Sequence, residues 1–255
     1  MTSSVGWSAD FQKGYYAYNK GDFATAFREW TPLAEQGYAS AQFNLGLLYG
    51  KGLGVIQDDK TALKWYRLSA EQGDTNAQYN VGVMYDEGLG VIQDHKTALK
   101  WYRLSAEQGN DGAQTNLGVM YKNGQGVLQD YKTAVKWFRL SAEQGNAVAQ
   151  YNLGVMYDNG KGVLQDYKTA VKWYKLAAEQ GSANAQYNLG VMYGNGQGVI
   201  QDNIYAHMWW NISASNGDKT AVNNRDVIAK RMTPTDISTA QKLARECVEK
   251  KYKGC

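Results

Sequence analysis

A period of 36 residues runs through most of this 255-residue chain and limits its fold more than any other feature. The dipeptide Ala-Gln begins at positions 41, 77, 113, 149 and 185. The triplet Glu-Gln-Gly ends at positions 37, 73, 109, 145 and 181, and Gly217 keeps the same step. A fixed period of this size is typical of repeat proteins, in which each unit buries its apolar face against its neighbours. The sequence therefore predicts a stack of similar units that share one continuous hydrophobic core.

Each copy reads as two short helices joined by a glycine-rich loop. In the fourth full copy, apolar residues recur at helical spacing, and residues 159–162 end this first helix because glycine accepts the positive φ of a C-terminal cap. Asp166 is a good N-cap for a second helix. Gly154 lies in the middle of the first helix, where glycine costs roughly 1 kcal/mol relative to alanine. We expect close approach of the second helix to offset this cost, with Ala170 opposite the glycine and Trp173 in the next layer.

These residues carry a family resemblance. The pattern Ala-x-x-x-Leu-Gly-x-x-Tyr is followed by Gly-x-Gly-Val-x-x-Asp and then by Ala-x-x-Trp-Tyr-x-x-Ala-x-x-Gly. The pattern resembles the Sel1-like repeat, a relative of the tetratricopeptide repeat with a longer internal loop. The resemblance covers five near-identical copies and implies an all-α fold, a right-handed α/α superhelical solenoid of Sel1-like helix pairs.

We expect one continuous solenoid domain with a capping element at each end. The first helix pair has a shorter connector, as in an ordinary tetratricopeptide unit, and Pro32 inside its second helix predicts a kink or a late restart. Near the other end, Thr233 as N-cap and Pro234 in the first turn predict the start of a last helix. The predicted parts are residues 1–9, a disordered segment or signal remnant; residues 10–37, the N-terminal capping repeat; residues 38–217, five repeats of 36 residues; and residues 218–255, the C-terminal capping helices.

Composition and motif content point away from several classes of protein. The net charge of +3 is small for this length, so it does not indicate nucleic-acid binding, and no apolar run is long enough for a membrane span. Neither metal-ligand spacing nor a nucleophile–base pair is present, so we predict no catalytic residue, no metal and no cofactor. Cys247 and Cys255 could pair with each other, which requires the end of the last helix to unwind. The start of the chain resembles the tail of a secretion signal, which favours an exported protein over a cytoplasmic one.

Three sets of recurring first-helix positions are candidates for a partner-binding site on the concave face. The mid-helix asparagines could grip the backbone of an extended peptide, or, as we prefer, each amide could bond the backbone of the adjacent loop. The preceding positions are mostly aromatic, and they could face the groove or pack between repeats. Residues of a third set differ between copies. Either selection for partner specificity or neutral drift at exposed positions would produce this variation. The predicted partner-binding residues are Phe43, Asn44, Tyr79, Asn80, Asp86, Asn116, Lys122, Tyr151, Asn152, Asp158, Tyr187 and Asn188.

The second helices carry recurring basic residues, such as Lys60 and Arg67 in the first full copy. Because Glu71 lies four residues after Arg67, we interpret this stripe as a solvated outer face of mixed charge. His95 stands where two other copies have tyrosine, and we interpret it as an isolated substitution rather than a ligand. Trp137 is predicted to be buried, so Trp137→Ala would cost ~3–5 kcal/mol.

The sequence favours a non-enzymatic scaffold that binds a peptide or protein partner on its concave face. The chain would act as a monomer, with end-to-end stacking of exposed solenoid ends as an alternative structural role. A small-ligand protein that binds or hydrolyses β-lactams, as in cysteine-rich relatives of the family, is the other alternative. This chain lacks the disulfide in every repeat that those relatives carry.

Overall fold

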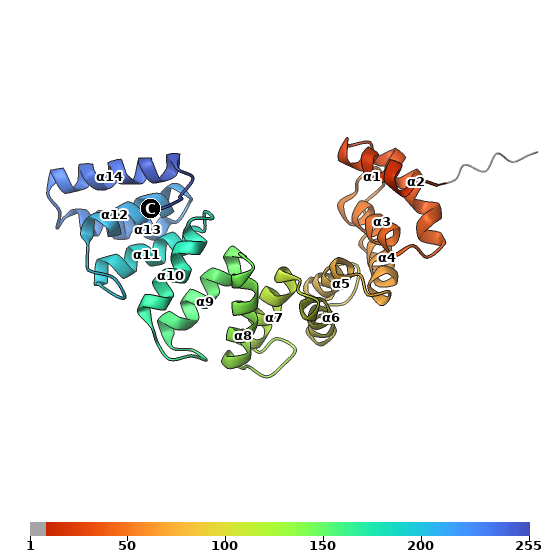
Figure 1. Ribbon diagram of the computed structural model, residues 1–255, viewed down its shortest axis with the longest axis horizontal. Coiled ribbons are helices and arrows are strands. Elements are labelled where there is room, and N and C mark those ends of the chain that lie inside the picture. Colours follow the sequence, from red (N-terminus) through yellow and green to blue (C-terminus); the bar gives the residue numbers. More distant parts are fainter. Residues whose placement is uncertain (1–8) are drawn as a thin grey trace, which may run out of the picture. The chain divides into compact units, whose positions relative to one another are not determined.

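The computed structural model describes residues 9–255, and this part of the chain folds into 14 α-helices without a β-strand (Figure 1). Its contacts divide the chain into two compact units. The first unit runs to Met120 and includes Gly124–Leu128, and the second comprises Tyr121–Asn123 and Gln129–Cys255. The predicted all-α solenoid of paired helices is confirmed. The predicted signal remnant falls mainly on residues 1–8, which lie outside the described residues.

The helices alternate between first and second members of successive repeats. Over residues 11–107 of the first unit and residues 131–229 of the second unit, each helix packs against the next helix along the chain. The helices are α1 (Phe11–Asn19), α2 (Phe23–Glu35), α3 (Ala39–Lys51), α4 (Asp59–Glu71), α5 (Thr75–Glu87), α6 (His95–Glu107), α7 (Asp111–Asn123), α8 (Tyr131–Glu143), α9 (Ala147–Asn159), α10 (Tyr167–Ala178), α11 (Ala183–Asn195), α12 (Asn203–Ser215), α13 (Lys219–Ala229) and α14 (Pro234–Glu249).

Local capping chemistry sets the ends of the helices. At the start of α10, Asp166 Oδ1 accepts the backbone N–H groups of Lys168 and Thr169, and its Oδ2 accepts the Thr169 hydroxyl at 2.6 Å. These bonds satisfy backbone donors that have no partner inside the helix. At the end of α9, Gly160 adopts a left-handed φ of 64°, as the sequence predicts. Equivalent aspartate caps begin the other second helices at Asp58, Asp94, Asp130 and Asp202.

The recurring mid-helix glycine makes room for an aromatic ring of the second helix. A Cβ at Gly154 would lie 2.7 Å from Cδ1 and Cε1 of Tyr174, which is far inside normal carbon–carbon contact. The predicted close approach of the second helix is therefore confirmed. The nearest side chain, however, is Tyr174 and not the predicted Ala170. Trp173, predicted to fill the next layer, lies partly exposed one position earlier. The same contact pairs Gly46 with Tyr66.

The prediction that Trp137 is a buried core residue is wrong for the same reason. Trp137 is partly exposed, whereas the next residue, Phe138, has no exposed surface. Ala134 and Ala142 lie one turn before and after Phe138, so the buried stripe of α8 runs through Phe138. Trp137→Ala should therefore cost less than the ~3–5 kcal/mol expected for deleting a fully buried aromatic ring.

Buried glutamines join successive repeats by side-chain hydrogen bonds. Gln42 Nε2 donates to the Ala34 carbonyl at 3.1 Å, and Gln42 Oε1 accepts from Gln72 Nε2 at 2.7 Å. This arrangement satisfies an end-of-helix carbonyl that has no partner inside its helix. It also connects two second helices one repeat apart, so the Ala-Gln marker has a structural role that the sequence alone did not assign. The same pair of bonds recurs at Gln78, Gln150 and Gln186. At Gln186 the donor is Asn216 instead of a glutamine.

The first repeat differs from the others but keeps the glycine–aromatic contact. A Cβ at Gly14 would lie 2.5 Å from Trp30 Nε1, so Trp30 takes the place that tyrosine has in later copies. Trp30 Nε1 donates to the Phe11 carbonyl at 3.2 Å, which satisfies the buried indole. Helix α2 continues through Pro32 to Glu35, so the predicted restart does not occur.

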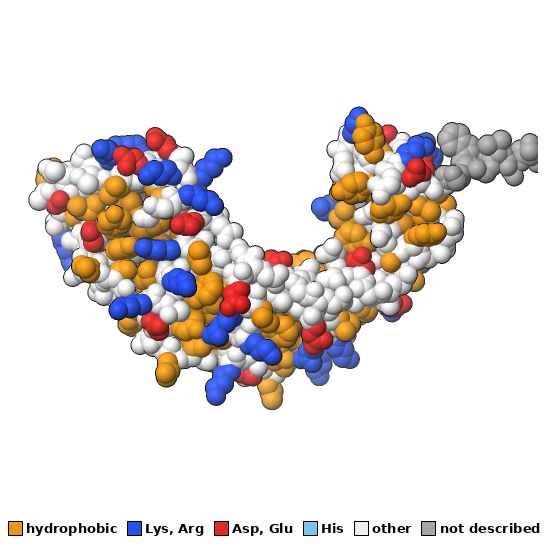
Figure 2. Space-filling model, in the orientation of Figure 1, with side chains coloured by type: hydrophobic (Ala, Val, Ile, Leu, Met, Phe, Trp, Pro, Cys, Tyr) orange, Lys and Arg blue, Asp and Glu red, His pale blue; other side chains and the backbone are white. Residues whose placement is uncertain are grey.

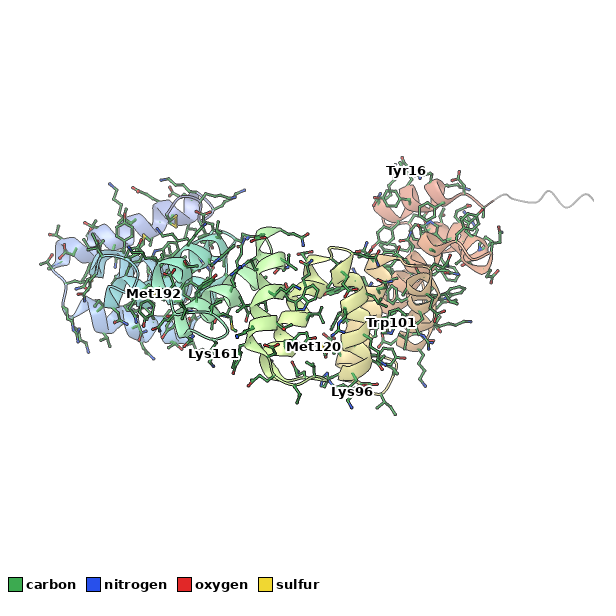
Figure 3. All side chains as sticks on the ribbon, turned by 60° about the horizontal axis from the view of Figure 1, so that its bottom comes forward. Tyr16, Lys96, Trp101, Met120, Lys161 and Met192 are labelled. Atoms are coloured by element: carbon green, nitrogen blue, oxygen red, sulfur yellow. A yellow bond between two sulfur atoms is a disulfide. The ribbon has the colours of Figure 1, made fainter. Side chains whose placement is uncertain are left out.

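The C-terminal part of the second unit covers the apolar helix α12. Helices α13 and α14 both pack against α12, whose Trp209 is 1 % exposed, and Met192 of α11 lies inside this unit (Figure 3). The predicted start of α14 is confirmed, because Thr233 and Asp236 form a reciprocal capping box. Helix α14 ends at Glu249, and a disulfide then joins the two cysteines at positions 247 and 255.

Candidate partner-binding face

One surface of the first helices carries the residues that the sequence singles out, and we call it the first-helix face. It consists of three rows that repeat with the period of the chain. The aromatic row is Phe43, Tyr79, Thr115, Tyr151 and Tyr187; the asparagine row is Asn44, Asn80, Asn116, Asn152 and Asn188; and the variable row is Gly50, Asp86, Lys122, Asp158 and Gly194. The spacing of one and seven residues places the three rows on one side of each helix.

The rings of the aromatic row are partly exposed and partly packed. Each of three rings lies against the buried tyrosine of its own repeat, in a tilted arrangement that stabilises the pair beyond area burial alone. Thr115 interrupts the row and is buried at 6 % exposure. The row therefore supports the repeat with one side of its rings and presents the remaining surface outward. The centroid distances are 5.8 Å for Phe43–Tyr66, 5.9 Å for Tyr79–Tyr102 and 6.1 Å for Tyr151–Tyr174.

Residues of the asparagine row lie beside side chains of the preceding repeat. Burial raises the pKa of the Tyr174 hydroxyl, and the Asn188 amide beside it opposes that shift. In the divergent last copy, Asn224 Nδ2 donates to the Tyr187 hydroxyl at 3.1 Å. Asn152 Nδ2 instead donates at 2.9 Å to the Val148 carbonyl one turn earlier in its own helix. The preferred prediction that these amides bond loop backbone is therefore wrong at Asn152 and Asn224. The amides of Asn80 and Asn116 lie beside the hydroxyls of Tyr66 and Tyr102 and oppose the effect of burial on their pKa.

In two repeats an aspartate of the variable row lies next to the hydroxyl of the buried tyrosine. The Tyr174 hydroxyl donates to Asp158 Oδ2 at 3.1 Å, and the Tyr102 hydroxyl lies 3.4 Å from Asp86 Oδ2. Burial raises the pKa of Asp158, and the hydrogen bond from Tyr174 opposes that shift. Asp86 also faces His95, whose Nδ1 lies 2.7 Å from Asp86 Oδ1. The interpretation of His95 as isolated is thus wrong, because it is the ion-pairing partner of Asp86 when protonated.

The repeat between these two replaces the same groups together. Phe138 stands where three other copies have tyrosine and the fifth has Trp210, so it has no hydroxyl for Asn152. Lys122 then donates from Nζ to Asn152 Oδ1 at 2.9 Å and lies 6.0 Å from the centroid of the Phe138 ring. Burial lowers the pKa of Lys122, and the nearby Lys161 lowers it further. In this repeat Lys122 and Phe138 therefore lie beside each other at the positions where the two flanking repeats have aspartate and tyrosine.

A polar hollow of about 310 Å³ opens on the first-helix face of the second unit. It lies where residues of α9, α11 and the start of α13 converge, and it contains three of the predicted partner-binding residues. Asp218 is the only charged side chain in it. The hollow is lined by Tyr151, Asn184, Tyr187, Asn188, Asp218 and Thr220.

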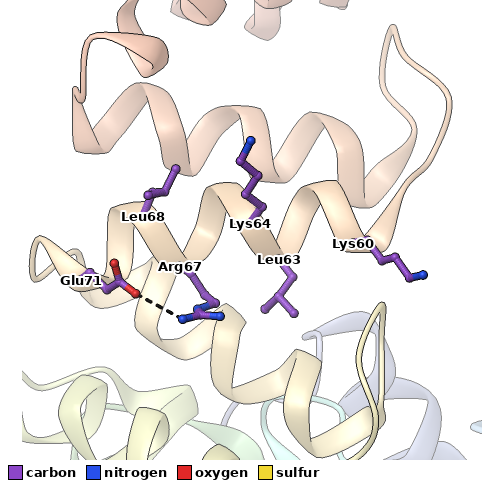
Figure 4. Close-up of a pocket in the computed structure, with 6 residues that line it drawn as sticks. All are labelled: Lys60, Leu63, Lys64, Arg67, Leu68 and Glu71. Carbon is purple, nitrogen blue, oxygen red and sulfur yellow. Dashed lines mark ion pairs between the residues drawn. The ribbon is translucent and has the colours of Figure 1, made fainter.

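A second hollow, of about 360 Å³, follows the outer side of α4 and has a different character (Figure 4). Lys60, Lys64 and Arg67 line it together with Glu71. Arg67 forms an ion pair with Glu71 at 3.5 Å, and both side chains are about half exposed, so this pair contributes little to stability. The interpretation of the basic stripe as a solvated face of mixed charge agrees with this arrangement. In Figure 2 basic, acidic and apolar side chains likewise alternate over the visible face of each unit.

Among residues 9–255, no three His, Cys, Asp or Glu side chains form a group that could hold a metal ion. Within the same range, no helix combines the length and the apolar character that crossing a bilayer requires. The functional groups of the first-helix face are therefore aromatic rings, amides and a few partly buried charges.

The fold and this face define an α-helical repeat protein of the solenoid class. The chain belongs to the Sel1 repeat family, because the family model described as Sel1 repeat matches residues 39–74, 75–110, 112–146, 147–182 and 183–218. A comparison with curated proteins finds no match.

Solved structures of other repeat proteins are similar to this chain. A Sel1 repeat protein from Oxalobacter formigenes shares 33 % identity, with a TM-score of 0.81 over 93 % of this chain and 99 % of that one. A protective antigen of uropathogenic Escherichia coli with an SLR fold shares 29 % identity, with a TM-score of 0.47 over 95 % of this chain and 69 % of that one. An immunity protein from Pseudomonas aeruginosa shares 21 % identity, with a TM-score of 0.49 over 81 % of this chain and 82 % of that one.

Proposed function

We propose that the protein is a non-catalytic scaffold that binds a peptide or protein partner on its first-helix face. The observation that carries this proposal is the difference in surroundings between the asparagine row and the aromatic row. The amides of Asn80, Asn116 and Asn188 lie beside buried tyrosine hydroxyls of the preceding repeat, whereas the rings of the aromatic row keep part of their surface exposed. Partly exposed tyrosines with polar tips are typical of protein interfaces, because they bury large area with few rotatable bonds.

The predicted partner-binding residues take different parts in this proposal. The exposed ring surface of Tyr79, Tyr151 and Tyr187 would supply most of the contact area. Lys122 and Asp158, both in the second unit, would supply charges of opposite sign from copies that are otherwise alike, which can select the register of a bound chain. The asparagines would mainly support the surface. Both ends of the Asn152 amide are already engaged, because its Nδ2 donates to the Val148 carbonyl and its Oδ1 accepts from Lys122.

The second unit also bears on the compartment in which the scaffold works. Cys247 and Cys255 form a disulfide, and structural disulfides persist in oxidising compartments such as the bacterial periplasm. This pairing supports the proposal of an exported protein, and it leaves the repeats themselves without disulfides.

The test is site-specific photo-crosslinking in extracts of the source organism, followed by binding measurements with the captured protein after purification. A photoreactive residue replaces Val148, which is 58 % exposed on α9, and in a second variant it replaces Leu164, which is 91 % exposed on a loop. We expect one protein to be crosslinked from position 148 and not from position 164. The substitutions Tyr151→Thr and Tyr187→Thr should weaken its binding at least tenfold, since the chain itself places a threonine in this row at position 115. Capture from position 164 alone, or binding that survives both threonine variants, would contradict the proposal.

A further inference from the structure

We propose that the polar hollow between α9, α11 and α13 holds the guanidinium group of an arginine side chain from the bound partner. This inference rests on the proposed use of the first-helix face, and it adds the chemical class of the group bound at one position. The hollow has a volume of about 310 Å³, at the small end of the range for ligand sites. One long side chain fits such a volume, whereas a folded domain does not.

The charge of the hollow favours a cation. Asp218 is its one charged lining residue, and no lysine or arginine lines it. Tyr151 and Tyr187 place two phenol rings beside this carboxylate, and the face of an aromatic ring attracts a cation within about 6 Å of its centroid. An anionic group would meet the carboxylate without any compensating positive side chain.

The hydrogen bonds already made in the hollow favour a ligand that only donates. The Asp218 carboxylate accepts the N–H groups of Thr220 at 2.8 Å and Ala221 at 3.2 Å, and the Ser213 hydroxyl at 3.1 Å. A carboxylate has roughly four acceptor positions, so acceptor capacity remains. Asn188 also lines the hollow, and its side-chain carbonyl oxygen can accept a hydrogen bond from a ligand. A guanidinium presents about five N–H donors in one plane and has no acceptor, so it matches these groups.

The hollow also occurs at a defined place in the repeat pattern. One period earlier, Ser182 stands at the position of Asp218, and Val148 stands at the position of Asn184. The carboxylate and the amide therefore come together beside the tyrosine pair only where the regular copies give way to α13. An arginine seated there would fix the register of a partner chain along the second unit.

The experiment is an NMR titration of the full chain with three short peptides that differ in one side chain. The probes are acetyl-Gly-Arg-Gly-amide, the same peptide with citrulline, which has the shape of arginine without its charge, and the same peptide with lysine. We expect the arginine peptide to shift the ring signals of Tyr151 and Tyr187 and the amide signal of Asn188. It should bind at least fivefold more tightly than either analogue. Equal affinity for the citrulline or the lysine peptide would overturn the assignment to a guanidinium.

A charge-removing variant tests the role of the carboxylate. Asparagine caps a helix as well as aspartate does, so Asp218→Asn keeps the cap of α13 and removes the charge. The matched control is Asp166→Asn, which makes the same change at the N-cap of α10, outside the hollow. We expect Asp218→Asn to weaken the arginine peptide at least fivefold and Asp166→Asn to leave it unchanged. Equal effects of the two variants would overturn the inference.

The outcomes separate this inference from the proposed function. If photo-crosslinking from position 148 succeeds while the arginine peptide fails to bind, only the arginine assignment is lost. If the peptide binds while crosslinking yields no partner, the hollow recognises guanidinium but the scaffold proposal is contradicted.

Discussion

Two glycines of α3 should respond in opposite directions to the same substitution. Gly46 and Gly50 are one turn apart in a single helix, and neither has a positive φ, so alanine suits the backbone at both positions. Alanine in place of glycine stabilises a helix by roughly 1 kcal/mol in its interior and less near its end. A Cβ at Gly50 would lie 3.6 Å from Ala62 Cβ, which is ordinary contact. Gly50→Ala should therefore stabilise the protein by about 0.5 kcal/mol.

At Gly46 the same methyl group has no space. The Cβ would lie 2.6 Å from Tyr66 Cδ1 and 2.7 Å from its Cε1, whereas carbon atoms pack at roughly 3.5–4.0 Å, so ring and helix must separate by about 1 Å. The ring cannot turn away freely, because it is buried and Phe43 packs against it. Overpacking of this kind costs about 1–3 kcal/mol, and a tightly held ring belongs at the upper end. After the helix gain is subtracted, Gly46→Ala should destabilise by about 2 kcal/mol.

The assay is thermal and urea unfolding followed by circular dichroism. We expect the melting temperature of Gly46→Ala to fall by about 4–8 °C, given about 2–4 °C per kcal/mol for a chain of this size. Gly50→Ala should melt at or slightly above the parent. Adding Tyr66→Leu to Gly46→Ala should remove most of the penalty that the alanine adds, because the flat ring is gone. If Gly46→Ala raised the melting temperature as Gly50→Ala does, the close-packing explanation of the recurring glycine would be refuted.

Three further predictions follow from the second unit. Burial lowers the pKa of His207 below its usual 6.5. The stability that the neutral, buried His207 contributes is therefore complete above pH 6.5 and is lost as the pH falls through the folded-state pKa. The melting temperature should drop between pH 7 and 5 in the parent and much less in His207→Val. Reduction of the Cys247–Cys255 disulfide, or Cys247→Ser, should free the tail, and trypsin followed by mass spectrometry should then cut the tail lysines at least tenfold faster, while an unchanged rate would contradict this. Lys122→Asp and Phe138→Tyr should each destabilise the protein by about 1 kcal/mol in urea unfolding. The double variant, which copies the neighbouring repeats, should recover most of that loss. Strictly additive losses would show that the two sites are not coupled.

The sequence predicts those parts of the fold that depend on local chemistry. Asp166 can be read as a cap, because the bonds it makes involve only the next three residues. Gly160 can be read as a helix end, because a left-handed backbone favours glycine whatever its surroundings. The Thr233–Pro234 start of α14 belongs to the same class. These signals recur with the period, so each copy reinforces the assignment of the next.

Contacts between helices are not specified by such local signals. The second helices carry two adjacent aromatic residues, and both lie near the boundary of the apolar stripe, so spacing alone does not decide whether Trp137 or Phe138 is buried. The decision comes from the glycine of the facing helix, which accepts one ring and not the other. The tyrosine hydroxyl beside each of several asparagines was missed because the two residues belong to different repeats, as Asn188 and Tyr174 do. The sequence did contain a usable signal, because Asp86 and Asp158 occur with tyrosine and Lys122 occurs with phenylalanine.

Repetition also explains why binding capacity should gather at the departures from the pattern. A position that recurs in every copy has partners that recur as well. Gln42 bonds the Ala34 carbonyl and Gln72, and Gln78 bonds the Ala70 carbonyl and Gln108 in the same way. Such groups are satisfied by the stack and have little left for a ligand. At the boundary with α13, Asp218 enters where the preceding copy has Ser182, and no cation lines the hollow beside it. A negative charge that the repeat pattern does not balance is the kind of group that a partner can pair, and this is why the arginine site is expected there rather than along the regular asparagine row.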